Sequence, residues 1–406
     1  MADPRNDMAA GKSGGMDHII LAFFPFGGYN GDTEQEGGTH MANLLSAYRG
    51  CLLGLAVGDA MGYTVDSRSL AEIREDYGPN GLMGYDLVNG YADVTSYTQL
   101  AAFTCNGLLF GLTRGQMQGK MAPFVRYIAL SHREWAAGQR LWGRPQQTYC
   151  WLLQQKEICR RHCMDTWMLD TLGRDVLGTP EEPVNHFTSP GALTAAVGVG
   201  MFFNPNTMEQ EEIDRLGAES VALTHGSPLA FLPGAVAAHL ISRCLRQRNA
   251  TLSELIEQSL EALSEQFGRE YGQTEEICAL VRQAMTMAQE ETLAPVDAME
   301  RLRCETGAQV LAGSIYACLV SERDFDNAMI IAVNHSGRSA AVGALTGAIL
   351  GARMGAEALP EFYLECLEPA MLLVELADDL YHGCPMEMGS RMFDGDWDRK
   401  YLHGGK

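Results

Sequence analysis

The chain is short of basic residues. It has 406 residues, of which 30 are Lys or Arg and 51 are Asp or Glu, so its formal net charge at pH 7 is −21. An acidic surface of this kind repels nucleic-acid backbones and anionic lipid surfaces. The few basic runs, such as Arg160-Arg161-His162, are too short to form a binding surface for phosphates. The composition therefore argues against nucleic acid and membranes as partners.

Export signals, membrane anchors and zinc-finger spacings are also missing. The apolar run Ile19–Phe26 contains Pro25 and is shorter than the roughly 18 residues that span a bilayer. The residues before it lack the basic region of a secretory signal. Eleven cysteines are scattered in a pattern typical of reduced thiols, and the cluster Cys159–Cys163 has no second ligand pair. We therefore expect a cytoplasmic protein without structural zinc.

Helical periodicity dominates what is present. Apolar residues recur at three- and four-residue spacing, which predicts one compact all-α domain over residues 41–385. Residues 1–40 are expected to form an N-terminal extension with a short edge strand, and residues 386–406 a C-terminal tail. We expect helices near 41–61, 68–76, 96–113, 120–137, 145–170, 190–201, 209–224, 228–246, 252–267, 273–290, 295–304, 307–321, 324–335, 339–355 and 361–381.

Two of these helices are rich in small residues. Residues 50–62 and 343–352 contain glycines at four-residue spacing. A glycine inside a helix costs about 1 kcal/mol relative to alanine, so its repetition needs a packing reason. Close contact between buried helices is the simplest such reason.

Three motifs resemble the ADP-ribosylglycohydrolase family, which includes the dinitrogenase reductase-activating glycohydrolase. Residues 48–62 resemble the opening helix of the family, which ends in Gly-Asp-Ala-x-Gly. Residues 224–228 and 346–352 resemble a mid-chain helix end and a late small-residue helix. The resemblance covers about residues 45–380. It implies an all-α fold with a central ligand cleft, and cleavage of ADP-ribose from a modified side chain at two Mg²⁺ ions.

The aspartates that hold those ions in the family are replaced here. Thr95-Ser96-Tyr97-Thr98 stands where the family has Thr-Asp-Asp-Thr. Ser336-Gly337-Arg338-Ser339-Ala340 stands where it has Gly-Gly-Asp-x-Asp. Mg²⁺ needs several oxygen ligands, and two ions close together need several carboxylates. With all four aspartates absent, we predict that the dinuclear Mg²⁺ site is lost and that the chain has no metal cofactor.

Several site residues nevertheless remain as candidates. The resemblance places Asp66 where the family has a glutamate, and a carboxylate in a cleft can act as a general acid or base. Asp59 is expected beside the cleft, where it caps or braces the next turn. Tyr97 either stacks on a ligand or fills the volume of the ions. His335 is expected to be structural. Residues 189–195 resemble a ligand loop of the family but lack its Asn, Met and Arg.

An anion is the expected ligand of the altered motif. Ser336, Gly337, Arg338 and Ser339 precede a predicted helix, whose free N–H groups favour negative charge. Arg338 adds a guanidinium suited to phosphate or carboxylate. The candidate ligand-binding set is thus Asp59, Thr95, Ser96, Tyr97, Thr98, Ser336, Gly337, Arg338 and Ser339. The alternative is that Arg338 faces solvent or pairs with a local carboxylate such as Asp93.

Three functions follow from these observations. The first is a non-catalytic or repurposed family member that binds an ADP-ribosyl-like or other anionic ligand, or a protein partner, in the old cleft. The second is a hydrolase, such as an N-glycosidase, that works without metal and uses Asp66 as its acid or base. The third is a structural or assembly protein that acts through residues 1–40.

Overall fold

A computed structural model describes residues 37–140, 148–206, 208–387 and 392–406, and in these residues regular structure is helical. The helices are α2 (Gly37–Tyr63), α3 (Leu70–Tyr77), α4 (Ser96–Gln118), α5 (Phe124–Gln139), η1 (Trp151–Gln154), α6 (Trp167–Leu172), α7 (Ala195–Phe202), α8 (Gln210–Ala222), α9 (Pro228–Arg246), α10 (Leu252–Phe267), α11 (Gln273–Met287), α12 (Pro295–Leu302), α13 (Gly307–Val320), α14 (Phe325–Val333), α15 (Ser339–Met354), η2 (Ala356–Ala358), α16 (Glu361–Cys366), α17 (Ala370–His382) and α18 (Gly395–Leu402). The predicted all-α fold is confirmed.

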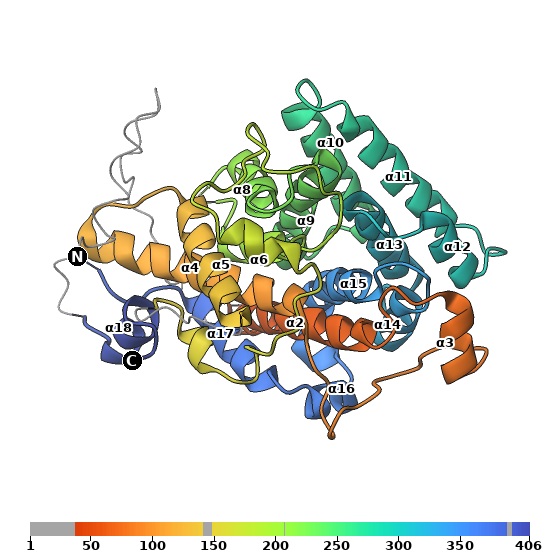
Figure 1. The fold of residues 1–406 in the computed structure, drawn as a ribbon, viewed down its shortest axis with the longest axis horizontal. Helices are drawn as coiled ribbons and strands as arrows, with labels where there is room; N and C mark the ends of the chain where they lie inside the picture. The colour runs from red at the N-terminus through yellow and green to blue at the C-terminus, as the bar shows by residue number, and fades with distance from the viewer. Residues whose placement is uncertain (1–36, 141–147, 207, 388–391) are drawn as a thin grey trace.

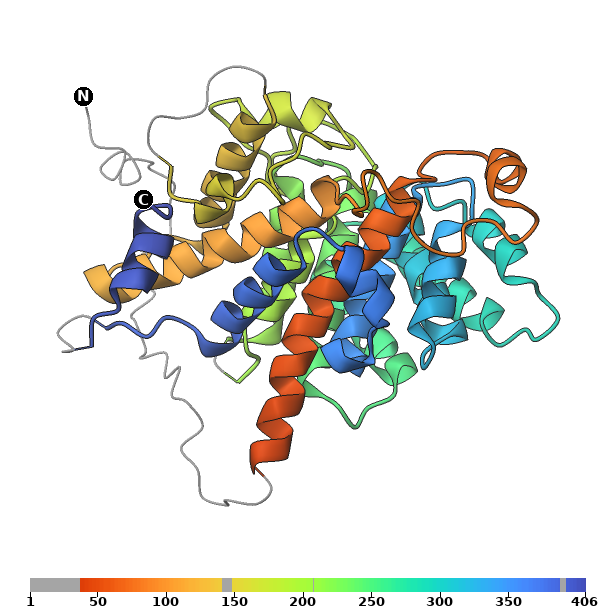
Figure 2. The same cartoon turned by 90° about the horizontal axis from the view of Figure 1, so that it is seen from below.

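Helices α2 and α15 form the centre of the molecule and lie side by side (Figures 1 and 2). Their glycines face one another in antiparallel order: Gly50 meets Gly351, Gly54 meets Gly347 and Gly58 meets Gly343. A Cβ atom at any of these positions would overlap backbone of the opposite helix. Repeated glycine therefore lets the two backbones touch, which is the close contact expected from the sequence.

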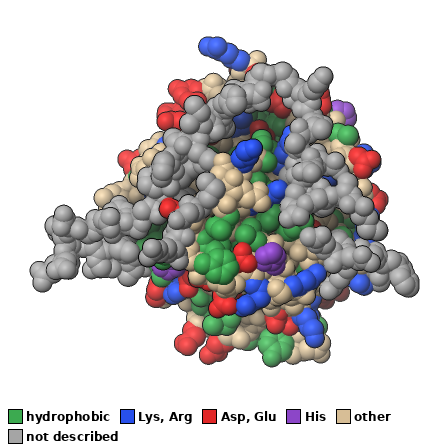
Figure 3. Space-filling model, turned by 90° about the vertical axis from the view of Figure 1, so that its left-hand side faces the viewer, with side chains coloured by type: hydrophobic (Ala, Val, Ile, Leu, Met, Phe, Trp, Pro, Cys, Tyr) green, Lys and Arg blue, Asp and Glu red, His purple; other side chains and the backbone are tan. Residues whose placement is uncertain are grey.

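Other helices cover this central pair. Helix α17 packs on α2, α4 packs on α5 and α7, and α9 packs on α7 and α8. Leu44–Tyr63 and Pro228–Arg246 are long and apolar enough to cross a membrane, but 83% of each hydrophobic window is buried inside the protein. In this fold both segments are core helices. The face in Figure 3 shows acidic and basic side chains interspersed.

Two helix predictions are wrong. The segment predicted as a helix at 145–170 is irregular from 155 to 166, in its described part, between the short helices η1 and α6. Backbone groups of this segment form hydrogen bonds with other parts of the chain. The Glu134 carboxylate accepts from the Tyr149 and Cys150 N–H groups, and the His162 carbonyl accepts from the Ser96 N–H. The helix expected at 361–381 is broken between α16 and α17. Proline at 369 disfavours helical backbone in the preceding residue.

The sequence predicts a segment outside the helical domain at each end of the chain. The edge strand expected near Ile19–Phe26 lies outside the described residues. Within the segment expected as a tail, α18 packs against α4, and the Trp397 indole N–H donates to the Thr113 hydroxyl at 2.9 Å. Trp397 and Tyr401 are buried, so this part of the tail belongs to the helical body.

Candidate functional site

Arg338 lies at the centre of a cluster where α2 ends and α15 begins. Its Nε is 3.3 Å from the Asp66 carboxylate, and its Nη1 is 3.2 Å from Asp165 Oδ1. Its Nη2 donates to the Tyr97 hydroxyl at 3.0 Å. The Arg338 side chain is 16% exposed, and the side chains of Asp66 and Asp165 are 5% and 8% exposed. The guanidinium is therefore a largely buried cation held between two carboxylates.

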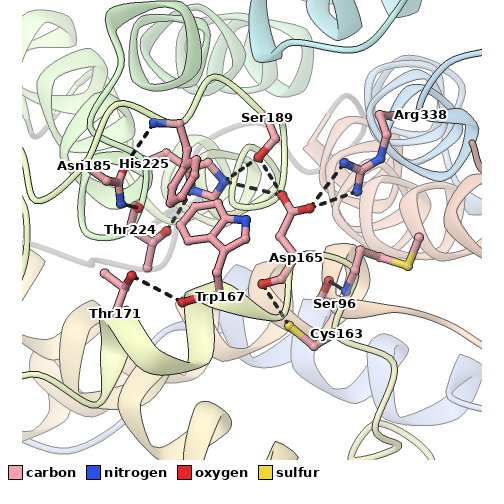
Figure 4. A network of polar contacts seen from close by, with 12 residues as sticks. Ser96, Cys163, Asp165, Trp167, Thr171, Asn185, Ser189, Thr224, His225 and Arg338 are labelled. Atoms are coloured by element: carbon pink, nitrogen blue, oxygen red, sulfur yellow. Dashed lines mark hydrogen bonds and ion pairs between the residues drawn. The ribbon is translucent and has the colours of Figure 1, made fainter.

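Asp165 extends this cluster towards His225, as Figure 4 shows. The Ser189 hydroxyl donates to Asp165 Oδ2 at 2.7 Å and lies 3.2 Å from His225 Nε2. His225 Nδ1 lies 2.9 Å from the Thr224 hydroxyl, and the ring packs edge-on against Trp167. These contacts fix Asp165 from one side while Arg338 holds it from the other.

The N-terminus of α15 is already occupied from within the chain. The Ala340 N–H donates to Asp66 Oδ1 at 2.9 Å, and the Arg338 N–H donates to the Cys304 carbonyl. The Ser336 N–H and hydroxyl both donate to Glu300. The anion that the helix end was expected to attract is thus the carboxylate of Asp66.

Asp59 performs the capping role that the sequence suggested. Its carboxylate accepts from the N–H and hydroxyl groups of both Thr95 and Thr98, at 2.6 to 3.0 Å. Thr95 is the N-cap of α4, and its own hydroxyl accepts from the Tyr97 N–H. Asp59 is fully buried. The side chain therefore joins the end of α2 to the start of α4.

The pKa values of the three buried aspartates differ because their neighbours differ. Burial raises the pKa of Asp59 to about 6, against the effect of its hydrogen bonds. Burial also raises the pKa of Asp66, partly opposed by Arg338. At Asp165 burial acts in the same direction, but the His225 contact, Arg338 and Ser189 outweigh it and lower the pKa to about 2. Asp165 is therefore the firmly ionised partner of Arg338 at neutral pH.

These residues do not fit a pair of Mg²⁺ ions. Ser96, Tyr97, Arg338 and Ala340 offer no carboxylate, and Asp66 and Asp165 are both bound to the guanidinium. In the described part of the chain, no group of three His, Cys, Asp or Glu side chains is arranged to hold a metal. The site supplies its positive charge from an arginine instead of from ions that need several oxygen ligands.

Most other predicted site residues lie within this region but are fully buried. Tyr97 is 0% exposed, so it fills volume and accepts from Arg338 and does not offer a face for stacking. The Ser96 hydroxyl accepts from the Met164 N–H. Ser339 is also buried, whereas Ser336 is exposed.

Gly337 and His335 have structural contacts. The Gly337 N–H donates to His335 Nδ1 at 3.0 Å, and His335 Nε2 lies 3.0 Å from the Ala332 carbonyl. A Cβ on Gly337 would overlap the carbonyl of Arg303. Burial lowers the pKa of His335 to about 4, so the ring is neutral at pH 7. Both residues therefore shape the turn before α15.

The alternative that Arg338 pairs with a carboxylate agrees with the structure, but Asp93, the example named for it, is the wrong partner. Asp93 pairs with Arg160 at 2.7 Å, and Arg338 pairs with Asp66 and Asp165. Sequence reasoning missed Asp165 because it lies in the segment expected to be helical, 173 residues before Arg338. An aspartate able to pair with Arg338 could have been sought elsewhere in the chain, but no local sequence pattern distinguishes Asp165 from other aspartates.

An aromatic pair lies beside this cluster. The Trp167 and Phe187 rings are in contact, with centroids 3.9 Å apart and planes tilted by 35°, and Phe187 is 45% exposed. Trp167 follows Asp165 by two residues and its ring packs against His225 within the polar network (Figure 4), and Phe187 precedes Ser189 by two residues. The pair is joined to the Arg338 cluster through His225, which contacts both Trp167 and Asp165.

Comparisons with known proteins agree with this fold. Residues 40–388 match the family described as ADP-ribosylglycohydrolase, and the chain therefore belongs to that family. A solved structure titled "ADP-ribosylglycohydrolase-related protein complex" superposes with a TM-score of 0.53 at 20% identity, covering 84% of this chain and 98% of that chain. The likeness to that structure concerns the fold alone. The comparison with curated proteins found no match.

Proposed function

We propose that this protein is a non-hydrolytic member of the ADP-ribosylglycohydrolase family that recognises the nucleoside part of an ADP-ribosyl-like ligand without metal. The observation that carries the proposal is the Arg338 guanidinium held between Asp66 and Asp165. One guanidinium and two carboxylates leave no net positive charge, and the Ser339 and Ala340 N–H groups at the start of α15 are paired within the chain. A strongly anionic ligand finds little attraction at such a site, and no Lewis acid is available from these residues.

The aromatic pair supports recognition of a planar ring. Phe187 exposes part of its ring, and Trp167 backs it at 3.9 Å. Aromatic faces of this kind stack with other planar π-systems, including nucleobases. The Ser189 hydroxyl, two residues after Phe187, is half-buried and adds a polar group for a sugar. We also assign the protein to the cytosol, since all eleven cysteines are free.

A metal-independent hydrolase is the second candidate, because burial raises the pKa of Asp66 as a general acid or base requires. Asp66 is poorly placed to move a proton, however. Its Oδ1 accepts from the Ala340 N–H and its Oδ2 contacts Arg338 and Ser67. Both oxygens are thus engaged in holding the ends of α2 and α15.

Titration calorimetry tests the proposal. We expect ADP-ribose and adenosine to bind with similar affinity, and we expect neither titration to change when Mg²⁺ is added. Phe187→Ala should weaken both ligands at least about fivefold, since stacking on one base contributes about 1–3 kcal/mol. The matched control is Phe362→Ala, an exposed phenylalanine on α16. Heat that appears only with Mg²⁺ would contradict the proposal, and turnover of an ADP-ribosylated arginine that Asp66→Ala abolishes would favour the hydrolase.

A further inference from the structure

An open groove lies between α17 and the segment 151–157. The apolar residues Trp151, Met371, Leu372 and Val374 are part of its lining. Met371 is 79% exposed, the largest exposure of any large hydrophobic residue in the described part of the chain. Apolar surface of this kind, with polar residues around it, is typical of a contact site for another polypeptide segment.

Four acidic residues of the groove already pair with cations of the same chain. The pairs are Asp378–Arg49, Glu375–Lys400, Asp379–Lys400 and Glu368–Arg160. A cationic ligand would have to displace arginine or lysine side chains from these carboxylates. The surface that remains uncovered in the groove is mainly apolar, which favours an uncharged, apolar occupant.

The same chain contains an apolar run without charged side chains, Ile19–Phe26, before the described residues begin. Ten residues, 27–36, connect this run to Gly37 at the start of α2. Ten residues span at most about 33–36 Å when fully extended. Because burial of apolar side chains is favourable, an apolar groove within this distance is a suitable place for the run.

The groove lies within reach of this connection. Helix α17 packs beside α2 (Figure 2), and Arg49 of α2 pairs with Asp378, which lines the groove. Arg49 lies about 18 Å along the helix from Gly37. The axes of packed helices are about 8–10 Å apart, so Phe26 has to cross about 28 Å or less to reach Asp378. Met371 lies about 10 Å further along α17, a distance that the run itself can cover.

We propose that Ile19–Phe26 docks in this groove of its own chain and covers Met371. The short connection holds the run at a local concentration on the order of 1 mM, so the contact within one chain is favoured over a contact with a second copy. The contact is independent of the function proposed for the Arg338 cluster, because the two share no residue.

Oxidation of the full chain by dilute hydrogen peroxide, read by mass spectrometry after digestion, tests this proposal. In the double variant Phe23→Asp, Phe24→Asp the run becomes charged and should leave the groove. Met371 should then be oxidised at least about fivefold faster than in the wild type, because its sulfur is no longer covered. Met83, which is 54% exposed and does not line the groove, should be oxidised at the same rate in both proteins.

The matched control is the double variant Asn30→Asp, Gly31→Asp, which adds the same two charges outside the run and should not change the rate at Met371. Dilution of the wild type by about a hundredfold should not change this rate either, since the contact lies within one chain. Equal rates in the wild type and in Phe23→Asp, Phe24→Asp would overturn the proposal. A rate that rises on dilution would also overturn it, because the groove would then hold a second copy of the chain.

A variant of the groove locates the contact. Val374→Asp, at a half-buried lining residue, should accelerate the oxidation of Met371 about as much as the charged run does. Combining the two changes should give no further acceleration, because both remove the same contact. Phe362→Asp, at an exposed residue outside the groove, should leave the rate unchanged. Additive effects of the run and groove variants would place the run on another surface and contradict the proposal.

Discussion

The contact between α2 and α15 has two parts that follow different physical rules. Along most of its length, glycine backbones touch, and any added Cβ atom would overlap the opposite helix. At the end where α2 finishes and α15 begins, the backbones still touch at Gly62 and Ser339, and the ion pairs of Arg338 with Asp66 and Asp165 are added to that contact. The glycine part leaves no room for a larger side chain. The charged part depends on a balance between one guanidinium and two carboxylates.

The largest effect is expected in the glycine part. Gly54→Leu would place side-chain atoms on the Gly347 carbonyl, and we expect the free energy of unfolding to fall by about 4 kcal/mol or more. Denaturant unfolding followed by circular dichroism measures it. Gly272→Ala is the control, because its Cβ meets no atom within 4 Å and its φ of −60° suits alanine. A Gly54→Leu protein as stable as the wild type would show that the helices can separate at little cost.

Removing the cation should have the next largest effect. Arg338→Met leaves Asp66 and Asp165 buried without their partner, which should lower the free energy of unfolding by about 3–5 kcal/mol at pH 7. The deficit should shrink as pH falls, because protonation removes the unpaired charges. Arg282→Met breaks an exposed pair with Glu257 and should cost about 1 kcal/mol or less. If the free energy of unfolding falls by the same small amount in both variants, the ion pairs of Arg338 do not stabilise the fold.

Acid unfolding isolates the contribution of Asp165. Its folded pKa of about 2 lies below the unfolded value of about 3.9, so its stabilisation is present above pH 4 and is lost as pH falls through 2. Asp165→Asn should therefore be less stable by about 2–3 kcal/mol at pH 7 and should lose less stability between pH 4 and 2. Asp170→Asn, at a side chain that is 85% exposed, should leave the acid transition unchanged. If Asp165→Asn lost as much stability as the wild type between pH 4 and 2, the acid unfolding would not depend on Asp165.

The smallest effect is expected at the cap that joins α2 to α4. Thr95→Ala removes one hydroxyl from Asp59 and the N-cap of α4, which should cost about 1–2 kcal/mol. It should also raise the pKa of Asp59 above 6, because a donor to the charged form is lost. Carboxyl-carbon NMR reads the pKa, and Thr286→Ala, at an exposed threonine, is the control. No change in the Asp59 titration would contradict the capping role.

Local patterns predicted much of the fold because helices depend on short-range spacing. Helix α10, for example, begins with a capping box between Thr251 and Glu254, and α12 has a proline in its first turn, both of which are local signals of a helix start. Residues 145–170 and the break before α17 were missed. In the first case, hydrogen bonds to the Glu134 carboxylate and from the Ser96 N–H, both outside the segment, replace helical ones. In the second, a single proline outweighed a continuous apolar pattern.

For the candidate site, too, some features follow from the sequence and others only from the tertiary structure. The sequence by itself determined that the four expected aspartates are absent, that a cation stands among their positions and that glycines force α2 and α15 together. Only the tertiary structure decided that Asp165 and Asp66 hold that cation and that the end of α15 is closed by Asp66. The physical reason is that ion pairs depend on distance in space: Asp165 and Arg338 meet within 3.2 Å across 173 residues of chain, and no local spacing encodes such a meeting.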